Sequence, residues 1–119
     1  MSDQFVHLHL HSQYSLLDGA IKFDELFDEV EKQGMSSVAL TDHGNLFGAY
    51  DFYKKAKDKG IKPIVGCELY IAKDHLNKSS ENNKTHHLTV LAKNLQGYEN
   101  LCSLVSIGHL KGCLLYTSP

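Results

Sequence analysis

The chain has 119 residues, a hydrophobic fraction of 42% and a formal net charge of −2. This length and hydrophobicity exclude a disordered chain and suit one small globular domain or part of a larger one. The near-neutral charge gives no sign of general nucleic-acid binding, so any contact with DNA would need a local basic patch. The basic cluster of the chain, which we interpret as a solvated helix face, consists of Lys54, Lys55, Lys57, Lys59 and Lys62.

The three cysteines, Cys67, Cys102 and Cys113, are odd in number and widely spaced. This pattern argues against a disulfide framework or a zinc ribbon and indicates a reducing compartment. The chain also has no run of about 18 apolar residues, which a membrane span would need. Its first residues lack the basic and then apolar pattern of a signal peptide. We therefore expect a cytoplasmic protein without a membrane contact.

Four short apolar runs are rich in Val, Ile or Leu and are bounded by Gly, Asn or Asp, which is typical of strands. The predicted strands are residues 5–10, 37–41, 63–72 and 88–92. A polar segment, residues 73–85, separates the last two and predicts an exposed loop. The strands alternate with helical patterns, which indicates right-handed βαβ units and a parallel sheet. Periodicity alone allows either a small open α/β sheet or the first half of a barrel.

The first predicted helix follows the spacing i, i+3, i+4, i+7, and Gly34 stands where its C-terminus would need left-handed backbone. Its expected buried face, for which no N-cap residue is evident, consists of Phe23, Leu26, Phe27 and Val30. The second helix is predicted between a cap at Asn45 and a stop at Gly60. Its expected buried face consists of Leu46, Ala49, Tyr50 and Tyr53. For the third helix we expect a cap at Asn94 and a buried face of Leu101, Leu104 and Val105.

Histidines and carboxylates recur where these strands end, and functional groups gather at such ends in parallel α/β folds. His9 and His11 are two residues apart, so their side chains would share one face of a strand. The other members of the set, in chain order, are Asp18, Asp42, His43, Glu68 and His87. His87 is the exception because it begins its strand. We expect either a strand boundary a few residues away or a side chain that points inward from lower down.

Imidazoles mixed with carboxylates suit Zn²⁺, Mn²⁺ or Fe²⁺ better than Ca²⁺ or Mg²⁺ alone. These groups outnumber the positions around one tetrahedral ion, so the pattern indicates a cluster of two or more ions. Neighbouring ions can clamp a phosphate, activate a water and stabilise a leaving oxygen, which is the chemistry of phosphoester hydrolysis.

Each of these residues also has a structural interpretation. A lone H-x-H is a weak signal, His43 could close a turn or cap a helix, and Asp18 before a glycine is equally a turn residue. Glu68 is harder to dismiss, because a buried carboxylate must be paired or bound to a metal. We interpret His7 as structural. Surface positions are expected for His75 and His109, and core positions for Tyr50, Phe52 and Tyr53.

Three runs carry a specific resemblance: HLHLHSQYSLLDGA, ALTDHGNLFGAYDFYKKAKDKGIKPIVGCELYIA and HHLTVLAKNLQGYENLCSLVS. From about residue 5 to about residue 112 the chain resembles the PHP (polymerase and histidinol phosphatase) domain at the N-terminus of bacterial DNA polymerase III alpha subunits. The resemblance implies an α/β fold, the first part of a distorted (β/α)7 barrel with a three-metal cleft at the C-terminal face of its strands. The metal ligands that it implies are His9, His11, Asp18, His43, Glu68 and His87, with Asp42 supporting a ligand from behind and His86 unmatched.

In this family the domain precedes a replicative polymerase core, and in some members it is a metal-dependent 3′–5′ exonuclease that proofreads. The resemblance therefore implies DNA and other replicase subunits as partners of the parent protein. In other members the ligands are lost and the domain is a scaffold; the complete first half of the ligand set favours an active member here. The alternatives are an inactive structural module of the replicase and a stand-alone phosphatase of the same superfamily. The run TDHGNLFGAY weighs against the phosphatase.

The later ligand motifs and the polymerase aspartates of the family are not in these residues. We therefore expect this chain alone to be inactive, and to be marginally stable because half a barrel exposes strand edges. We assign residues 1–112 to the N-terminal part of the PHP domain. Residues 113–119 depart from the family pattern, so we interpret them as a non-native sequence end and assign no function to Cys113 or Tyr116.

Overall fold

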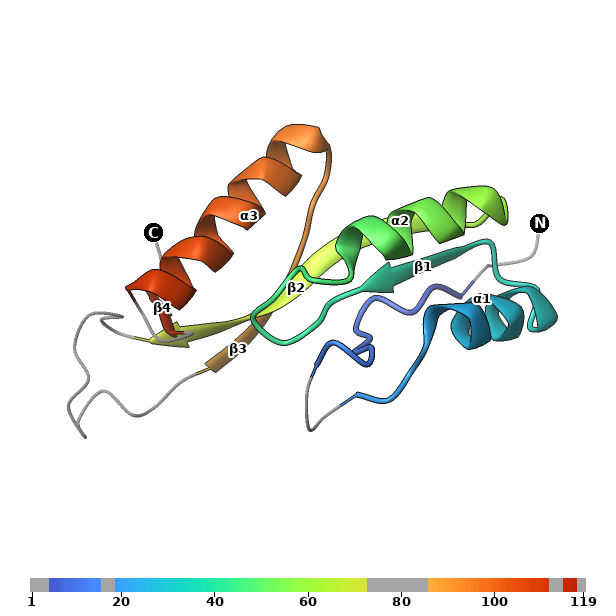
Figure 1. The fold of residues 1–119 in the computed structure, drawn as a ribbon, viewed down its shortest axis with the longest axis horizontal. Helices are drawn as coiled ribbons and strands as arrows, with labels where there is room; N and C mark the ends of the chain where they lie inside the picture. Colours follow the sequence, from blue (N-terminus) through green and yellow to red (C-terminus); the bar gives the residue numbers. More distant parts are fainter. Residues whose placement is uncertain (1–4, 16–18, 73–85, 112–114, 118–119) are drawn as a thin grey trace.

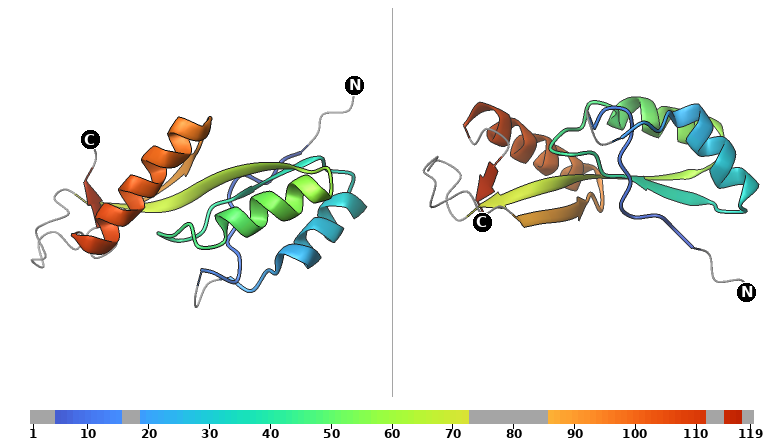
Figure 2. Two further views of the ribbon diagram at one scale, coloured as in Figure 1. Left: turned by 45° about the horizontal axis from the view of Figure 1, so that its top comes forward. Right: turned by 90° about the horizontal axis from the view of Figure 1, so that it is seen from below.

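A computed structural model describes residues 5–15, 19–72, 86–111 and 115–117 of the chain. Helices and strands follow one another along it (Figure 1), in the order α1 (Phe23–Lys32), β1 (Ser37–Leu40), α2 (Ala49–Asp58), β2 (Lys62–Ala72), β3 (His86–Leu91), α3 (Leu95–Leu110) and β4 (Leu115–Thr117). The three helices lie on one side of the strands (Figure 2). Within the described residues, no helix combines the length and apolar character that crossing a membrane requires.

Strand β2 is the long central strand, and its two halves have different neighbours. Its first half pairs in parallel with β1, from Ser37 opposite Lys62 to Leu40 opposite Val65. Its second half pairs antiparallel with β3, and its last residues, 70–72, pair in parallel with β4. The prediction of an all-parallel sheet is therefore wrong for β3. Parallel neighbours need a crossover connection, usually a helix, and the polar segment 73–85 has no apolar period from which a helix could be built.

The segment predicted as the first strand, residues 5–10, does not form a strand. It runs beside β1 and joins it through two backbone hydrogen bonds of 2.9 Å, from the N–H of Ala39 to the carbonyl of His7 and from the N–H of Thr41 to the carbonyl of Leu10. The two bonds are three positions apart on the N-terminal segment but only two positions apart on the β1 side. The N-terminal segment thus has one extra residue between them, which interrupts the ladder as a bulge does. The hydroxyl of Thr41 accepts the N–H of Leu10 at 2.8 Å.

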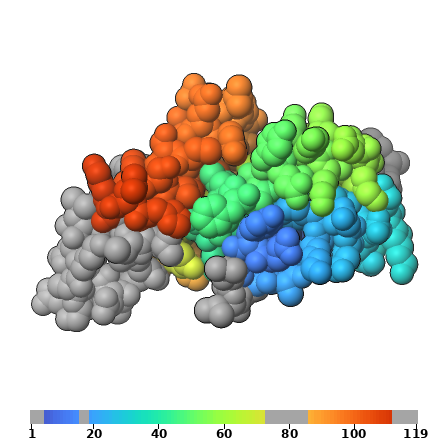
Figure 3. All heavy atoms as spheres, in the orientation of Figure 1, coloured from blue at the N-terminus to red at the C-terminus, as the bar shows by residue number. Residues whose placement is uncertain are grey.

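The larger hydrophobic core lies between α1, α2 and the first half of the sheet. The predicted buried face of α1 is confirmed, because all four of its residues are buried. The ring of Phe52 packs at 5.6 Å from Phe23 and 5.5 Å from Phe27, measured between ring centroids. Figure 3 shows the N-terminal segment (blue) packed directly against α1 and the loop that follows β1.

The predicted buried positions of Ala49 and Phe52 on α2 are confirmed, but those of Tyr50 and Tyr53 are wrong. The buried residues of the helix are Ala49, Phe52 and Ala56, whereas Tyr50 and Tyr53 are 74% and 48% exposed. The sequence offered two apolar stripes, because aromatic residues flank Phe52 on both sides. Small alanines on one stripe let α2 approach the sheet closely, so that stripe was buried and the two tyrosines turned outward.

A smaller core joins β2 to α3, where Cys67 and Leu69 pack against Leu101 and Val105. Leu104, which was predicted to be buried with them, is 38% exposed.

The predicted helix ends are confirmed at three of four positions. Asn94 caps α3, because its side-chain oxygen accepts the N–H of Gly97 at 2.9 Å. Gly34 and Gly60 follow α1 and α2 with φ of 75° and 71°, a conformation that favours glycine. Asn45 does not cap α2, which begins four residues later. Its side-chain oxygen instead accepts the N–H of Phe47 at 3.2 Å, inside the loop after β1.

Candidate metal centre

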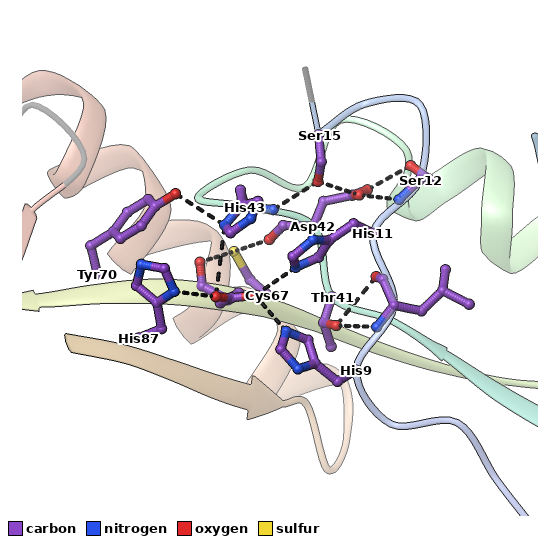
Figure 4. A network of polar contacts seen from close by, with 12 residues as sticks. His9, His11, Ser12, Ser15, Thr41, Asp42, His43, Cys67, Tyr70 and His87 are labelled. Atoms are coloured by element: carbon purple, nitrogen blue, oxygen red, sulfur yellow. Dashed lines mark hydrogen bonds and ion pairs between the residues drawn. The ribbon is translucent and has the colours of Figure 1, made fainter. Parts of the chain in front are cut away.

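The carboxylate of Glu68 is the centre of the candidate site. It projects from β2 and is 2% exposed. Its Oε2 lies 2.5 Å from Nε2 of His9 and 2.5 Å from Nε2 of His11. Its Oε1 lies 2.6 Å from Nδ1 of His87 and 3.8 Å from Nδ1 of His43. Four imidazoles from three separate segments thus surround one buried carboxylate, and Figure 4 shows how the rings of His9, His11, His43 and His87 gather there.

The histidines reach this point from three parts of the fold. His9 and His11 lie on the extended segment beside β1, two residues apart, and both side chains contact Glu68, so they share one face as predicted. His43 lies three residues after the end of β1 and forms an isolated parallel bridge with Glu68. His87 is at the start of β3, opposite Tyr70.

The antiparallel direction of β3 explains the position of His87. Because β3 runs against β2, the start of β3 lies beside the end of β2. Neither explanation considered from the sequence, a displaced strand boundary or a side chain from lower down, is therefore needed. The error in the sequence analysis was the assumption that β3 runs parallel to β2.

A line of stacked and edge-packed rings continues from the histidines to Tyr70. The ring centroids of His11 and His43 are 3.9 Å apart, and the ring of Tyr70 is parallel to that of His43 at 5.8 Å. The hydroxyl of Tyr70 lies 3.0 Å from Nδ1 of His43. Tyr70 was missed from the sequence, although it stands two residues after Glu68 and therefore on the same face of the strand.

Asp42 lies behind the histidines rather than among them. Its carboxylate accepts the N–H and the hydroxyl of Ser12, at 2.6 and 2.8 Å, and the hydroxyl of Ser15 at 2.7 Å. The hydroxyl of Ser15 in turn accepts the N–H of His43 at 3.0 Å. This network ties the segment that carries His11 to the loop that carries His43. The sequence analysis missed both serines, whose only signal was their position just after the H-x-H pattern.

The loop after Asp42 is also anchored to β2 and α3. The backbone N–H of Glu68 donates to the carbonyl of Asp42, and the N–H of Gly44 donates to the carbonyl of Glu68, both at 2.9 Å. Nε2 of His109, on α3, lies 2.8 Å from the carbonyl of Gly44. His109 is exposed, as predicted, but it holds this loop from the helix side.

The electrostatics of the site favour an ionised Glu68. Burial alone would raise the pKa of this carboxyl group, but hydrogen bonds from His9 and His11 and the nearby charge of His43 outweigh burial and lower the pKa below its ordinary value. On the next residue, burial raises the pKa of the Cys67 thiol to about 12, so the thiol stays protonated and is a poor ligand or nucleophile.

The donor set fits a divalent cation. One ligand atom each from His9, His11 and Glu68 lie within 4.8 Å of one another, close enough to share an ion at the usual bond lengths of about 2.0–2.2 Å. Imidazole and carboxylate together suit Zn²⁺, Mn²⁺ or Fe²⁺. The side chains of His9 and His87 are 58% and 52% exposed, so the site is open to solvent above its buried carboxylate.

The remaining sequence candidates stand apart from this centre or cannot be placed. Asp18 and His75 lie outside the described residues. His7 is exposed and packs edge-on against the ring of Phe5 at 4.7 Å. His86 is exposed and pairs with Ile71 in the sheet.

Comparison with known proteins agrees with this geometry. The family model described as the PHP domain matches residues 7–119. The chain is 54% identical over 112 residues to the N-terminal region of DNA polymerase III subunit alpha from Borreliella burgdorferi, covering 92% of this chain and 10% of that protein. It is 54% identical over 108 residues to the same subunit from Helicobacter pylori, covering 91% of this chain and 9% of that protein. It thus spans about a tenth of the length of these relatives.

Two solved structures share the fold. An amidohydrolase from Chromobacterium violaceum, solved with bound sulfate and no metal, matches with a TM-score of 0.58 and 26% identity over 88% of this chain and 34% of its own. A protein from Bifidobacterium adolescentis, named a candidate metal-dependent phosphoesterase, matches with a TM-score of 0.54 and 19% identity over 83% of this chain and 32% of its own. The chain therefore has a mixed α/β architecture with a partial sheet, consistent with the first part of a PHP barrel.

Proposed function

We propose, from the premise that this chain belongs to the PHP domain family, that it supplies the first half of a metal-dependent phosphoesterase site of a replicative DNA polymerase. The observation that carries the proposal is the convergence of His9, His11, His43 and His87 on the buried carboxylate of Glu68. The assignment of residues 1–112 to the domain, with residues 113–119 outside it, is part of the proposal.

The proposed ligands are the four histidines, Glu68 and Asp18. Divalent cations in such a site polarise a phosphoryl oxygen and lower the pKa of a water molecule. The residues behind the ligands hold them in place. Tyr70 orients the ring of His43 through the hydroxyl contact at 3.0 Å, and Asp42 fixes the two ligand-bearing segments to each other.

We further propose that the substrate is a phosphodiester at the 3′ end of DNA, so that the parent protein proofreads as well as polymerises. Polymerase III relatives support this substrate, since they are 46–54% identical to the chain. They also support other replicase subunits as partners and the cytoplasm as the location. The sulfate in the related amidohydrolase supports a site for a tetrahedral anion. More than one ion is proposed, because the candidate ligands outnumber the positions around one tetrahedral ion.

A structural role of the same module is the second candidate function. The network of Asp42 favours it, because this network would hold the segments together with or without a metal. A stand-alone phosphatase is disfavoured by the identity to polymerase subunits over nine-tenths of the chain.

The test uses calorimetric titration of the chain with Mn²⁺ and Zn²⁺. The double variant His9→Ala with His11→Ala should lose binding, whereas the matched control His7→Ala, a histidine of the same segment outside the site, should bind as the wild type does. Equal binding by the double variant would overturn the metal centre.

The exonuclease assignment is tested separately in the longer parent protein, with a 3′-labelled single-stranded oligonucleotide. The double variant should lose 3′ hydrolysis while its melting temperature in EDTA stays close to that of the wild type. A retained rate, or a rate lost only together with folding, would favour the structural role.

A further inference from the structure

A groove that the proposed site does not use lies between α2, the first half of β2 and the start of α3. Its volume is about 420 Å³, which is within the range of small-molecule sites. Figure 3 shows the surface hollowed between α2 (green) and the start of α3 (orange). Three tyrosines from two helices line it, Tyr50, Tyr53 and Tyr98, and Lys93 lies at its edge.

The floor of the groove is apolar and belongs to the other face of the sheet from the metal centre. Pro63 and Val65 contribute to it from β2. Side chains alternate along a strand, so these odd-numbered residues point away from the face that carries Glu68. The helices cover the same face as the groove (Figure 2). A ligand in the groove would therefore not touch the candidate metal ligands.

The wall that α2 contributes is aromatic, and lysines continue the same stripe of the helix beyond the groove. Tyr50, Tyr53, Lys54 and Lys57 follow i, i+3, i+4, i+7, so they share one stripe of the helix. The sequence analysis placed both tyrosines in the core, but Tyr50 is 74% exposed and Tyr53 is 48% exposed. The ammonium group of Lys57 lies over the ring of Tyr53, 5.9 Å from its centroid. Neighbouring exposed aromatic residues of this kind are a common feature of interaction sites.

The lysines of α2 divide into two groups by their partners. Lys55 lies 3.4 Å from Asp24, and the next residue after the helix, Lys59, lies 2.7 Å from Asp28, so both face α1. For Lys54 and Lys57 the described part of the chain provides no ion pair. The described residues that line the groove include Lys93 but no carboxylate. Lysines without an ion pair among the described residues therefore lie on the same helix stripe as the tyrosines and in the lining of the groove.

We propose that this groove binds a short stretch of single-stranded nucleic acid, with bases stacked on Tyr50, Tyr53 and Tyr98 and phosphates near Lys54, Lys57 and Lys93. Every base has a face that stacks on an aromatic ring, and cations beside the rings attract the backbone. The absence of acidic side chains from the described lining removes the repulsion that would exclude a polyanion. This proposal is independent of the metal centre.

The experiment measures fluorescence anisotropy of a labelled ten-nucleotide oligo-dT with the full chain, at low salt and in EDTA so that no metal contributes. Stacking is worth about 1–3 kcal/mol per base, so Tyr50→Ala with Tyr53→Ala should weaken binding at least about fivefold. The matched control is Phe5→Ala, an exposed aromatic outside the groove (66% exposed), which should bind as the wild type does. Far-UV circular dichroism checks that each variant is folded.

Two further arms separate stacking from charge and from general hydrophobicity. Tyr50→Leu with Tyr53→Leu keeps apolar area without rings and should lose binding like the alanine pair. Lys93→Ala should reduce the salt dependence of the affinity. Polyphosphate should compete poorly, because it carries charge without bases. The proposal would be overturned if both tyrosine double variants bound oligo-dT as tightly as the wild type does. It would also be overturned if polyphosphate at the same charge concentration displaced the oligonucleotide, or if the wild type bound no oligonucleotide at low salt.

Discussion

Asp42 and Glu68 are both buried carboxylates, 1% and 2% exposed, but their surroundings differ in kind. Asp42 accepts hydrogen bonds from one backbone N–H and two serine hydroxyls. These donors are neutral, and all three come from within the protein. Glu68 has imidazole nitrogens around it instead, from His9, His11, His43 and His87.

The difference separates a structural carboxylate from a proposed ligand. Each neutral imidazole carries one N–H and one lone pair, so four rings around Glu68 hold several lone pairs that a cation can accept at once. Beside Asp42 the backbone N–H and the serine hydroxyls point their protons at the carboxylate and offer a cation no nitrogen lone pair. We therefore expect substitutions at Asp42 to affect folding first, and substitutions at Glu68 to affect metal binding first.

The largest effect is expected for Asp42→Ala. It would leave three buried donors without their acceptor, and each such donor costs about 1–3 kcal/mol. We expect the free energy of unfolding, measured by urea denaturation in EDTA, to fall by about 3 kcal/mol or more. The control Asp28→Ala removes an exposed carboxylate and should cost less than about 1 kcal/mol. A loss at Asp42 no larger than at Asp28 would mean that the network is not what joins the two segments.

The second effect is metal-dependent stabilisation. A cation present at about a hundred times its Kd should raise the free energy of unfolding by about 2.7 kcal/mol. Glu68→Gln should abolish this increment, while its stability in EDTA changes less than that of Asp42→Ala. Thermal melts with Mn²⁺ and with EDTA provide the measurement. If Glu68→Gln is stabilised by Mn²⁺ as strongly as the wild type is, Glu68 is not a ligand.

The third effect is acid sensitivity in the absence of metal. The pKa of Glu68 is lower in the folded chain than its ordinary value of 4.5. The stability that it contributes is therefore present above pH 4.5 and is lost as the pH falls through the folded-state pKa. Urea midpoints measured down to this range in EDTA should fall more steeply for the wild type than for Glu68→Gln. Parallel curves for the two proteins would contradict an ionised, hydrogen-bonded Glu68.

The smallest effect is expected for Tyr70→Phe, which removes only the hydroxyl that contacts His43 at 3.0 Å. The loss of one hydrogen bond should cost about 1 kcal/mol of stability. Metal affinity, measured by titration calorimetry, should fall about tenfold, because residues behind a ligand fix its orientation. An unchanged affinity would show that packing alone orients the ring of His43.

Several elements could be predicted because their signals are local. The buried face of α1, the cap at Asn94 and the left-handed glycines at 34 and 60 follow from spacing and backbone chemistry within a few residues. The face of α2 could not be predicted, because two apolar stripes compete in its sequence. Which stripe was buried depended on how closely the helix approaches β2, a contact that periodicity does not contain.

The sequence by itself determined the candidate ligands, their order along the chain, and the family whose pattern they match. Only the tertiary structure decided how they meet. The direction of β3, and hence the position of His87 opposite Tyr70, depends on the hydrogen bonds between β2 and β3. The acceptor role of Asp42 rests on serines 27 and 30 residues away. Such contacts depend on the path of the whole chain, and no local pattern of residue types records that path.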